Sequence, residues 1–230
     1  MKIFADGADL ESMVALAADP RISGFTTNPT LMRKAGITDY EAFATKVLAT
    51  ITEHPISFEV FADEPAEMQR QARLIASWGD NVYVKIPVTN TRGVPTTELI
   101  HTLSESGVKL NVTALMTVDQ VEDVVGAARG GPGHVISVFA GRIADTGRDP
   151  VPIMSHALEV MAVDPSLELL WASPREVLNI AQARAVGVHI ITCTPDLLAK
   201  LDGFDKDLAQ FSLETVQMFH DDAAAAGFSL

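Results

Sequence analysis

The feature that most constrains the fold is a regular alternation of short apolar runs with longer amphipathic stretches. Eight runs rich in β-branched or apolar residues are predicted as strands, at residues 2–6, 23–27, 56–61, 82–86, 108–113, 134–139, 167–172 and 187–192. Helical patterns lie between them, for example at Pro65 to Trp78, Thr96 to Ser106, Val118 to Ala128 and Pro174 to Val186. Strands that alternate with helices at this spacing indicate βαβ units and a parallel sheet.

Eight such units in 230 residues predict a closed (β/α)8 barrel, a TIM barrel. An open doubly wound sheet is the alternative, but the glycine-rich phosphate-binding motifs G-x-G-x-x-G and G-x-x-x-x-G-K-[ST] are missing. Residues 205–226 are expected to form an extra C-terminal helix, because their apolar positions roughly follow a helical stripe. No linker interrupts the chain, so we predict one domain over residues 1–230.

The charge balance argues against two classes of partner. The formal net charge is −13, which disfavours binding to nucleic acid and to anionic membranes. No apolar run reaches membrane-spanning length, and the strand-like start Lys2 to Asp6 leaves no room for an export signal. The single cysteine, Cys193, excludes a disulfide framework, and the six scattered histidines show no metal-ligand spacing. We therefore expect a cytoplasmic protein without a metal.

Lys85 stands inside the apolar run Asn81 to Val88, which otherwise has the pattern of a buried strand. Lysine is almost never fully buried unless it is paired or functional. Burial disfavours the charged ammonium and favours a neutral amine, which can attack a carbonyl carbon. The strand therefore points to Schiff-base chemistry. The alternative is a lysine at a strand end that extends along its own methylene groups to water, and the strand alone does not decide between the two.

The other predicted strands also carry polar residues near their carboxyl ends, where (β/α)8 barrels build their active sites. Each has a structural alternative: Asp6 could start a helix, Asn28 could make a turn, and Glu59 could simply pair with Lys85. A buried ion pair is a poor source of stability, however, because desolvation can exceed the Coulombic gain. We therefore favour a functional site. Its candidates from the strand ends are Asp6, Thr26, Asn28, Glu59, Lys85, Asn111, Thr113, Ser137, Phe139, Arg142 and Ser173.

These residue types suit carbon–carbon bond cleavage next to an imine. The Lys85 amine would attack a ketone, and loss of water from the carbinolamine needs a proton donor. The imine then draws electrons from the adjacent bond, so a base must remove a proton from the departing carbon's hydroxyl. Asp6 and Glu59 could divide or share these duties. The remaining polar groups could orient hydroxyls, and Arg142 could hold a distal phosphate.

Four segments together resemble motifs of the transaldolase family, and most closely its short branch, which also contains the fructose-6-phosphate aldolases. They are Gly24-Phe25-Thr26-Thr27-Asn28-Pro29-Thr30, Val82-Tyr83-Val84-Lys85-Ile86-Pro87-Val88-Thr89, Asn111-Val112-Thr113-Ala114 and Ser137-Val138-Phe139-Ala140-Gly141-Arg142-Ile143. The likeness covers nearly the whole chain, with the motifs in the family's order. It implies a (β/α)8 class I aldolase, sugar-phosphate substrates, no cofactor, and a homo-oligomer of five or ten subunits.

The resemblance also implies individual roles. Lys85 matches the Schiff-base lysine and Asp6 the acid/base aspartate, while Glu59 matches a carboxylate that acts through a water shared with Thr113. The positions implied for substrate binding are Thr26, Asn28, Asn111, Ser137, Phe139, Arg142 and Ser173. Transaldolases resemble this chain in Glu59 and Phe139, where the aldolase branch typically has glutamine and tyrosine. Both positions favour transfer of a dihydroxyacetone unit over its release.

One departure from the family pattern follows the seventh predicted strand. The family usually continues with an aromatic and then a basic residue that helps to bind phosphate, whereas here Ser173 runs directly into Pro174 and Arg175. Arg175 either substitutes for the missing cation or faces elsewhere. The expected function is a transaldolase acting on a ketose phosphate and an aldehyde acceptor. The alternatives are an aldolase that releases dihydroxyacetone, an enzyme for a sugar with an altered end group, and a barrel without catalytic activity.

Overall fold

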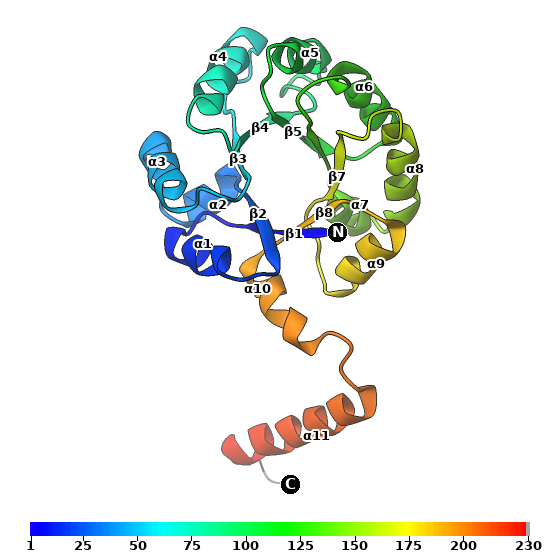
Figure 1. Cartoon of the computed structure of the whole chain (residues 1–230). Coiled ribbons are helices and arrows are strands. Elements are labelled where there is room, and N and C mark those ends of the chain that lie inside the picture. Colours follow the sequence, from blue (N-terminus) through cyan, green and yellow to red (C-terminus); the bar gives the residue numbers. More distant parts are fainter. Residues whose placement is uncertain (229–230) are drawn as a thin grey trace. The chain divides into compact units, whose positions relative to one another are not determined.

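The computed structural model describes residues 1–228 and confirms the (β/α)8 barrel. Eight parallel strands pair in chain order, and β8 pairs with β1 to close the barrel (Figure 1). The strands are β1 (Lys2–Asp6), β2 (Ile22–Thr26), β3 (Ile56–Glu59), β4 (Val82–Pro87), β5 (Leu110–Leu115), β6 (Val135–Val138), β7 (Glu168–Trp171) and β8 (Ile190–Cys193). The last two residues of the predicted domain lie outside the described part.

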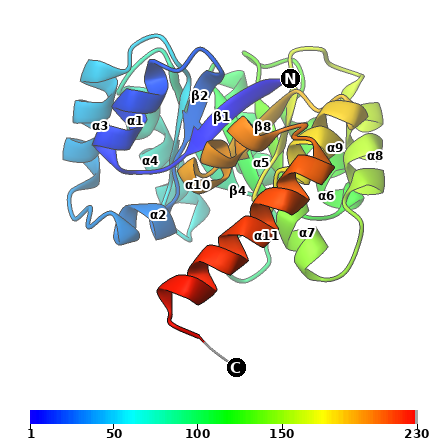
Figure 2. The same ribbon diagram turned by 90° about the horizontal axis from the view of Figure 1, so that it is seen from below.

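The helices form a ring around the strands, with α1 and α3 on one flank and α8 and α9 on the opposite one (Figures 1 and 2). They are α1 (Leu10–Ala17), α2 (Pro29–Lys34), α3 (Tyr40–Thr50), α4 (Pro65–Ala76), α5 (Thr97–Glu105), α6 (Val118–Ala128), α7 (Ala140–Asp145), α8 (Val151–Met161), α9 (Leu178–Val186) and α10 (Pro195–Leu198).

One predicted helix begins later than expected. Helix α9 starts at Leu178, so the predicted start at Pro174 was wrong. Two features account for the difference. Ser173 has a left-handed backbone (φ 57°), and the side chain of Asn179 accepts hydrogen bonds from the backbone N–H groups of Arg175 (2.7 Å) and Glu176 (3.2 Å). The Asn179 side chain thereby fixes the backbone of the connection that precedes α9.

The barrel interior changes character along its axis. An apolar cluster of Phe4, Val135, Leu170, Ala172 and Ile190 fills the interior, with Tyr83 and Phe139 packed against it. Leu170, Ala172 and Phe139 extend this apolar packing to the cavity at the carboxyl ends of the strands. The ring of Phe4 lies so close to Gly24 that a Cβ atom there would come within 2.6 Å of it. Because alternate strand residues share a face, Asp6 and Lys85, which stand two positions after Phe4 and Tyr83, point into the barrel nearer its carboxyl end.

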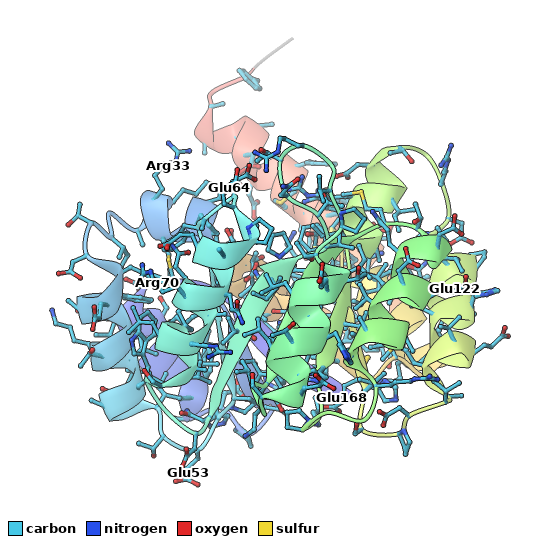
Figure 3. The ribbon with its side chains drawn as sticks, turned by 90° about the horizontal axis from the view of Figure 1, so that it is seen from above. Arg33, Glu53, Glu64, Arg70, Glu122 and Glu168 are labelled. Atoms are coloured by element: carbon cyan, nitrogen blue, oxygen red, sulfur yellow. The ribbon has the colours of Figure 1, made fainter. Side chains whose placement is uncertain are left out.

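Figure 3 distinguishes these two ends of the barrel. Arg33 and Glu64, which follow β2 and β3, lie at one end, while Glu53 and Glu168, which precede or begin a strand, lie at the other. The connections after each strand therefore gather at the end that carries the predicted site residues.

A second compact unit begins at Ala199. It contains a 3-10 turn (Ala199–Gly203) and helix α11 (Leu208–Ala225), which confirms the extra C-terminal helix within the predicted range. Several large apolar side chains of α11 are exposed, including Leu208, Phe211 and Phe219. Within residues 1–228, no helix combines the length and the apolar character needed to span a bilayer.

Candidate active site

A cavity of about 420 Å³ opens at the carboxyl ends of the strands. It brings together every predicted site residue except Arg175. Its wall consists of Asp6, Thr26, Asn28, Pro29, Thr30, Leu31, Glu59, Lys85, Asn111, Thr113, Ala114, Met116, Ser137, Phe139, Arg142, Leu170, Ala172, Ser173 and Thr192. Residues from all eight βα units contribute, as expected where strand ends converge.

Lys85 is buried and paired. It faces Glu59 across adjacent strands in direct register, and its Nζ lies 3.0 Å from Glu59 Oε2. The same nitrogen donates a hydrogen bond to the backbone oxygen of Thr27 (2.8 Å). Only 8% of the Lys85 side chain is exposed, against 18% for Glu59. The lysine therefore does not extend to bulk water; its amine is held inside the cavity by a carboxylate and a carbonyl.

Asp6 lies on the neighbouring side of the cavity in a hydrogen-bonded chain. Thr26 donates to its Oδ1 (2.8 Å), and Thr192 lies 2.6 Å from Thr26, so the Thr192 hydroxyl donates to Thr26 in turn. Burial raises the pKa of Asp6, opposed by the Lys85 charge and by hydrogen bonds from Thr26 and Asn28. A raised pKa suits a group that must both accept and return a proton.

Two structural alternatives for the strand-end residues can now be decided. Asp6 does not cap α1, because the side chain of Asp9 does so by accepting from Ser12 N–H (2.9 Å). Asn28 does cap α2: its Oδ1 accepts from Leu31 N–H (3.0 Å). Since its amide oxygen is fixed in this way, its amide nitrogen is directed to Asp6, 3.5 Å away. Asn28 therefore combines a helix cap with a place in the cavity wall.

Asn111 is fixed by its neighbours on both sides. Its Nδ2 donates to Ser57 Oγ (3.0 Å), and its Oδ1 accepts from Ser137 Oγ (2.6 Å). The three side chains come from β3, β5 and β6, and all three are buried. These two hydrogen bonds fix the orientation of the Asn111 amide group.

Thr113 differs from these groups. Its hydroxyl is buried and has no hydrogen-bond partner within residues 1–228, although Thr113 lines the cavity. The next residue, Ala114, has a left-handed backbone (φ 68°), and the register between β5 and β6 shifts between Val112 and Leu115. Left-handed backbone at a non-glycine residue is strained, and such bulges are common where a strand redirects a side chain at a site.

Arg142 provides a cation at the far side of the cavity. It belongs to α7, and its guanidinium carbon lies 5.4 Å from the centre of the Phe139 ring. Helix α7 packs tightly against the end of β7: Gly141 N–H donates to Ala172 O (3.2 Å), and a Cβ atom on Gly141 would come within 1.5 Å of Ser173 O. Only glycine fits this position, so the α7 segment and the Ser173 turn form one continuous wall.

Arg175 is directed elsewhere. Its guanidinium forms an ion pair with Asp145 at the end of α7, with Nε donating to Oδ1 at 3.1 Å. Both side chains are about half exposed, and Arg175 does not line the cavity. The structure therefore does not bring Arg175 to the other predicted site residues.

Two residues of the site, Ser57 and Tyr40, went unpredicted. Ser57 lies on the inward face of β3, and the two-residue period that places Glu59 inward also places Ser57 inward. Thr192, a polar residue of the eighth predicted strand, lines the cavity. Tyr40 hydrogen bonds to the backbone of Glu59 from α3, and no local sequence signal announces this contact. Within residues 1–228, no three His, Cys, Asp or Glu side chains lie close enough to hold a metal ion. The absence of a cofactor stays a prediction.

The fold and the cavity define a (β/α)8-barrel enzyme with an enclosed polar site. The chain belongs to the Transaldolase/Fructose-6-phosphate aldolase family, whose model it matches over residues 3–230. Similar proteins include a "Probable transaldolase" of Dehalococcoides mccartyi, 36% identical over 87% of this chain and 90% of that protein. A "Probable transaldolase 2" of Listeria monocytogenes is 34% identical over 92% of this chain and 98% of that protein. A "Probable transaldolase" of Methanococcus maripaludis is 33% identical, covering 94% and 99%.

Solved structures with more distant sequences share the fold. A putative phosphonomutase of Burkholderia cenocepacia has a TM-score of 0.58 at 14% identity, covering 94% of this chain and 93% of that one. A dihydrodipicolinate synthase of Rhodopseudomonas palustris has a TM-score of 0.54 at 17% identity, covering 83% and 69%. At such identities the likeness concerns the barrel alone.

Proposed function

We propose that this chain is a class I transaldolase. It would transfer a dihydroxyacetone unit from a ketose phosphate, such as fructose 6-phosphate, to an aldehyde acceptor, such as erythrose 4-phosphate. The observation that carries the proposal is the buried Lys85 amine, 3.0 Å from the Glu59 carboxylate inside the cavity. The family membership and the names of the relatives support it.

The first half of the reaction forms the imine. Lys85 gives a proton to Glu59, and the neutral amine attacks the ketone carbon of the donor. The carbinolamine then loses its hydroxyl as water, which requires a proton. Glu59 supplies it through a water held with Thr113, whose hydroxyl is otherwise unpartnered within residues 1–228. The product is a protonated imine that can accept an electron pair.

The second half exchanges the aldehyde. Asp6 removes a proton from the hydroxyl on the departing carbon, the carbon–carbon bond breaks, and its electrons pass to the imine to give an enamine. The first aldehyde leaves and the acceptor takes its place. The enamine attacks the new carbonyl carbon, and Asp6 returns its proton to the alkoxide. Hydrolysis of the imine frees the product and restores the Lys85 amine.

Polar side chains around these groups would orient the substrate. Asn28, Asn111 and Ser137 present fixed donors and acceptors to the hydroxyls of the dihydroxyacetone unit. Thr26 supports Asp6 and also lines the cavity. At the far end, Arg142 and the turn at Ser173 would receive the phosphate group, because guanidinium groups bind phosphate through paired charge-assisted hydrogen bonds.

A competing function is an aldolase that releases dihydroxyacetone. Release requires a proton on the enamine carbon, which restores the imine, and then attack of water on the imine carbon. Phe139 borders the cavity and has no hydroxyl to assist a water, so the enamine would persist until an acceptor arrives. Assays with and without an acceptor aldehyde separate the two. Equal rates of donor consumption in both would favour the aldolase.

A second competing hypothesis is a sugar with a different end group. Among residues 1–228, Lys85 and Arg142 are the only lysine or arginine side chains that line the cavity. Since Lys85 forms the imine, a distal phosphate would rely on Arg142 alone. Steady-state comparison of phosphorylated and unphosphorylated ketoses tests this hypothesis. A strong preference for fructose 6-phosphate would rule it out.

Borohydride reduction with fructose 6-phosphate, without acceptor, tests the proposed function directly. We expect peptide mapping by mass spectrometry to find a dihydroxyacetone-sized adduct on Lys85. A folded protein that gives no adduct with this or any other ketose would contradict the proposal and favour a barrel without catalytic activity.

We further propose that the enzyme works as a homo-oligomer, a pentamer or decamer, in the cytoplasm, within the pentose phosphate pathway. The support for self-association is the exposed apolar side chains of α11: Phe211, Val216 and Phe219 are 53%, 61% and 62% exposed. Apolar surface on this scale favours a protein partner. Native mass spectrometry would reveal the assembly, and a monomer at micromolar concentration would contradict it.

A further inference from the structure

The backbone ladder between β2 and β3 changes partners next to the lysine. Thr26 pairs with Ser57, and the following bond joins Thr27 N–H to Ser57 O (3.2 Å). In a regular parallel ladder, the next bond would run from Glu59 N–H to Thr27 O. Here Thr27 O accepts the Lys85 ammonium instead, at 2.8 Å. A carbonyl of the sheet is thus directed to the side chain that forms the imine.

The hydroxyl of Tyr40 takes the place of the missing carbonyl. It accepts a hydrogen bond from Glu59 N–H (2.7 Å) and donates one to Glu59 O (3.1 Å). One side chain thereby satisfies both backbone polar groups of Glu59. A buried N–H group without a hydrogen-bond partner destabilises the fold, so this contact keeps the strand end in place.

Tyr40 is itself held rigidly. It is the first residue of α3, whose N-cap Asp39 accepts from Ala42 N–H (2.9 Å). Its ring makes edge contacts with Phe58, Phe61 and Trp78, at centroid distances of 6.0, 4.5 and 5.6 Å. Burial raises the pKa of the Tyr40 hydroxyl, which therefore stays protonated. Tyr40 does not line the cavity, so it has no contact with a substrate there.

We propose that Tyr40 is a positioning residue for the Lys85–Glu59 pair, a role that rests on the proposed function of that pair. By bonding both backbone groups of Glu59, its hydroxyl directs the carboxylate toward Lys85 and frees Thr27 O to accept from the amine. Without the hydroxyl, Glu59 N–H would turn to Thr27 O. Lys85 would then lose one acceptor, and Glu59 would move relative to the amine.

Tyr40→Phe tests this role, because it removes the hydroxyl and keeps the ring. We expect kcat for transfer to fall about 10- to 100-fold while KM changes less than about threefold, since the substrate-binding side chains are untouched. Tyr83→Phe is the matched control. Tyr83 is the only other tyrosine; it lies near the amino-terminal end of β4 and does not line the cavity. A Tyr40→Phe enzyme with the kcat of Tyr83→Phe would overturn the proposal.

A second readout does not need catalysis. A brief pulse of acetic anhydride at a fixed pH, followed by peptide mapping, measures the extent to which the Lys85 amine is acetylated. The charged groups that face Lys85 are Glu59, Asp6 and Arg142, and both variants keep all three. We expect more Lys85 acetylation in Tyr40→Phe than in Tyr83→Phe, because Lys85 Nζ loses the hydrogen bond to Thr27 O that holds it. Equal acetylation in the two variants would overturn the proposal.

The two readouts separate this proposal from the proposed function. If wild type shows no transfer and no ketose adduct, the proposed function is wrong, and the extent of Lys85 acetylation still tests the role of Tyr40. If Tyr40→Phe does not fold, 3-fluorotyrosine is incorporated into Tyr83→Phe, which leaves one labelled site. We expect its ¹⁹F resonance to shift when Glu59→Gln is added or Lys85 is acetylated. A ¹⁹F chemical shift that is the same before and after both changes would refute the contact between Tyr40 and Glu59.

Discussion

The two ends of the barrel both bury polar groups, but they satisfy them differently. At the amino-terminal end, His134 is 1% exposed, and its Nδ1 accepts from Leu110 N–H (3.0 Å). Its Nε2 lies 2.9 Å from Ser104 Oγ, which donates to Ala128 O (3.1 Å). His189, which precedes β8, makes the same kind of bond: its Nδ1 accepts from Leu169 N–H (2.9 Å). Both rings thus accept hydrogen bonds directly from backbone N–H groups at the start of a strand.

At the carboxyl end, the buried groups carry charge and keep bonding capacity. Lys85 and Glu59 are paired across the cavity wall, and Thr113 keeps an unpartnered hydroxyl there among residues 1–228. A hydrogen-bond network in which every group has a partner stabilises the fold, whereas one with a free donor or acceptor can bind a ligand. The comparison teaches that burial of a polar group does not by itself identify a site; what matters is whether its bonds close on the backbone or on a cavity. Substitutions at the two ends should therefore affect different properties.

The largest effect is expected at Lys85. Lys85→Ala should lower transfer activity by at least about 10³-fold, because no other amine lines the cavity within residues 1–228. The fold should persist, as judged by circular dichroism. The matched control is Lys109→Ala at the amino-terminal end, where Lys109 lies over the Tyr83 ring. Near-normal turnover in Lys85→Ala would refute the assignment of the nucleophile.

Asp6→Asn should lower activity about 10²- to 10⁴-fold, the usual range for a general acid–base group. Because burial raises the pKa of Asp6, its carboxylate form costs stability above that pKa, and the cost disappears as pH falls through it. The variant lacks this cost, so its stability advantage over wild type should be largest near pH 8 and shrink toward acid. Urea unfolding between pH 5 and 8 measures both trends, and a variant destabilised at pH 8 would contradict the pKa argument.

The two arginines of the predicted site should differ in their effects on substrate binding. Arg142→Ala should raise KM for fructose 6-phosphate roughly 10- to 100-fold, since a charge-assisted hydrogen bond contributes about 1.5–3 kcal/mol. Arg175→Ala should change KM less than about threefold, because its guanidinium pairs with Asp145 outside the cavity. Steady-state measurement of KM for fructose 6-phosphate in both variants tests this difference. Equal effects would mean that Arg175 turns into the site when substrate binds.

The smallest effect on catalysis is expected at His134. His134→Leu should destabilise the fold by about 1–3 kcal/mol through the unpaired Leu110 N–H, with kcat within about twofold of wild type. Burial lowers the pKa of His134 to about 4, with a small opposing effect of Asp164. Folding thus favours the neutral ring, so wild type should lose stability as pH falls from 6.5 toward 4, by about 3 kcal/mol in all. A His134→Leu profile as steep as that of wild type would contradict this.

Much of the barrel could be predicted because each strand is a local pattern. The run at Val82 to Val88 announces β4 without knowledge of its neighbours, and the helix at Val118–Ala128 was predicted to the residue. The ends of strands were predicted less accurately: β5 begins at Leu110 and not at 108. Local apolar patterns do not encode where a register shift or a cap ends an element.

The candidate site was partly predictable for a geometric reason: parallel strands bring their carboxyl ends together, so strand-end polar residues converge. Contacts set by packing were not predictable. The bond from Tyr40 to Glu59 joins residues 19 positions apart, and the ion pair of Arg175 joins it to Asp145, 30 positions earlier. Neither leaves a signature in the residue types alone.

The close approach of Gly141 to the Ser173 carbonyl has a consequence for how this enzyme can diversify. Loops of a (β/α)8 barrel ordinarily vary one at a time, which lets a new substrate be accommodated by an insertion in a single connection. Here any side chain at position 141 requires the neighbouring connection to retreat. The two segments are therefore coupled in design, because a library that randomises position 141 must also vary the connection at Ser173.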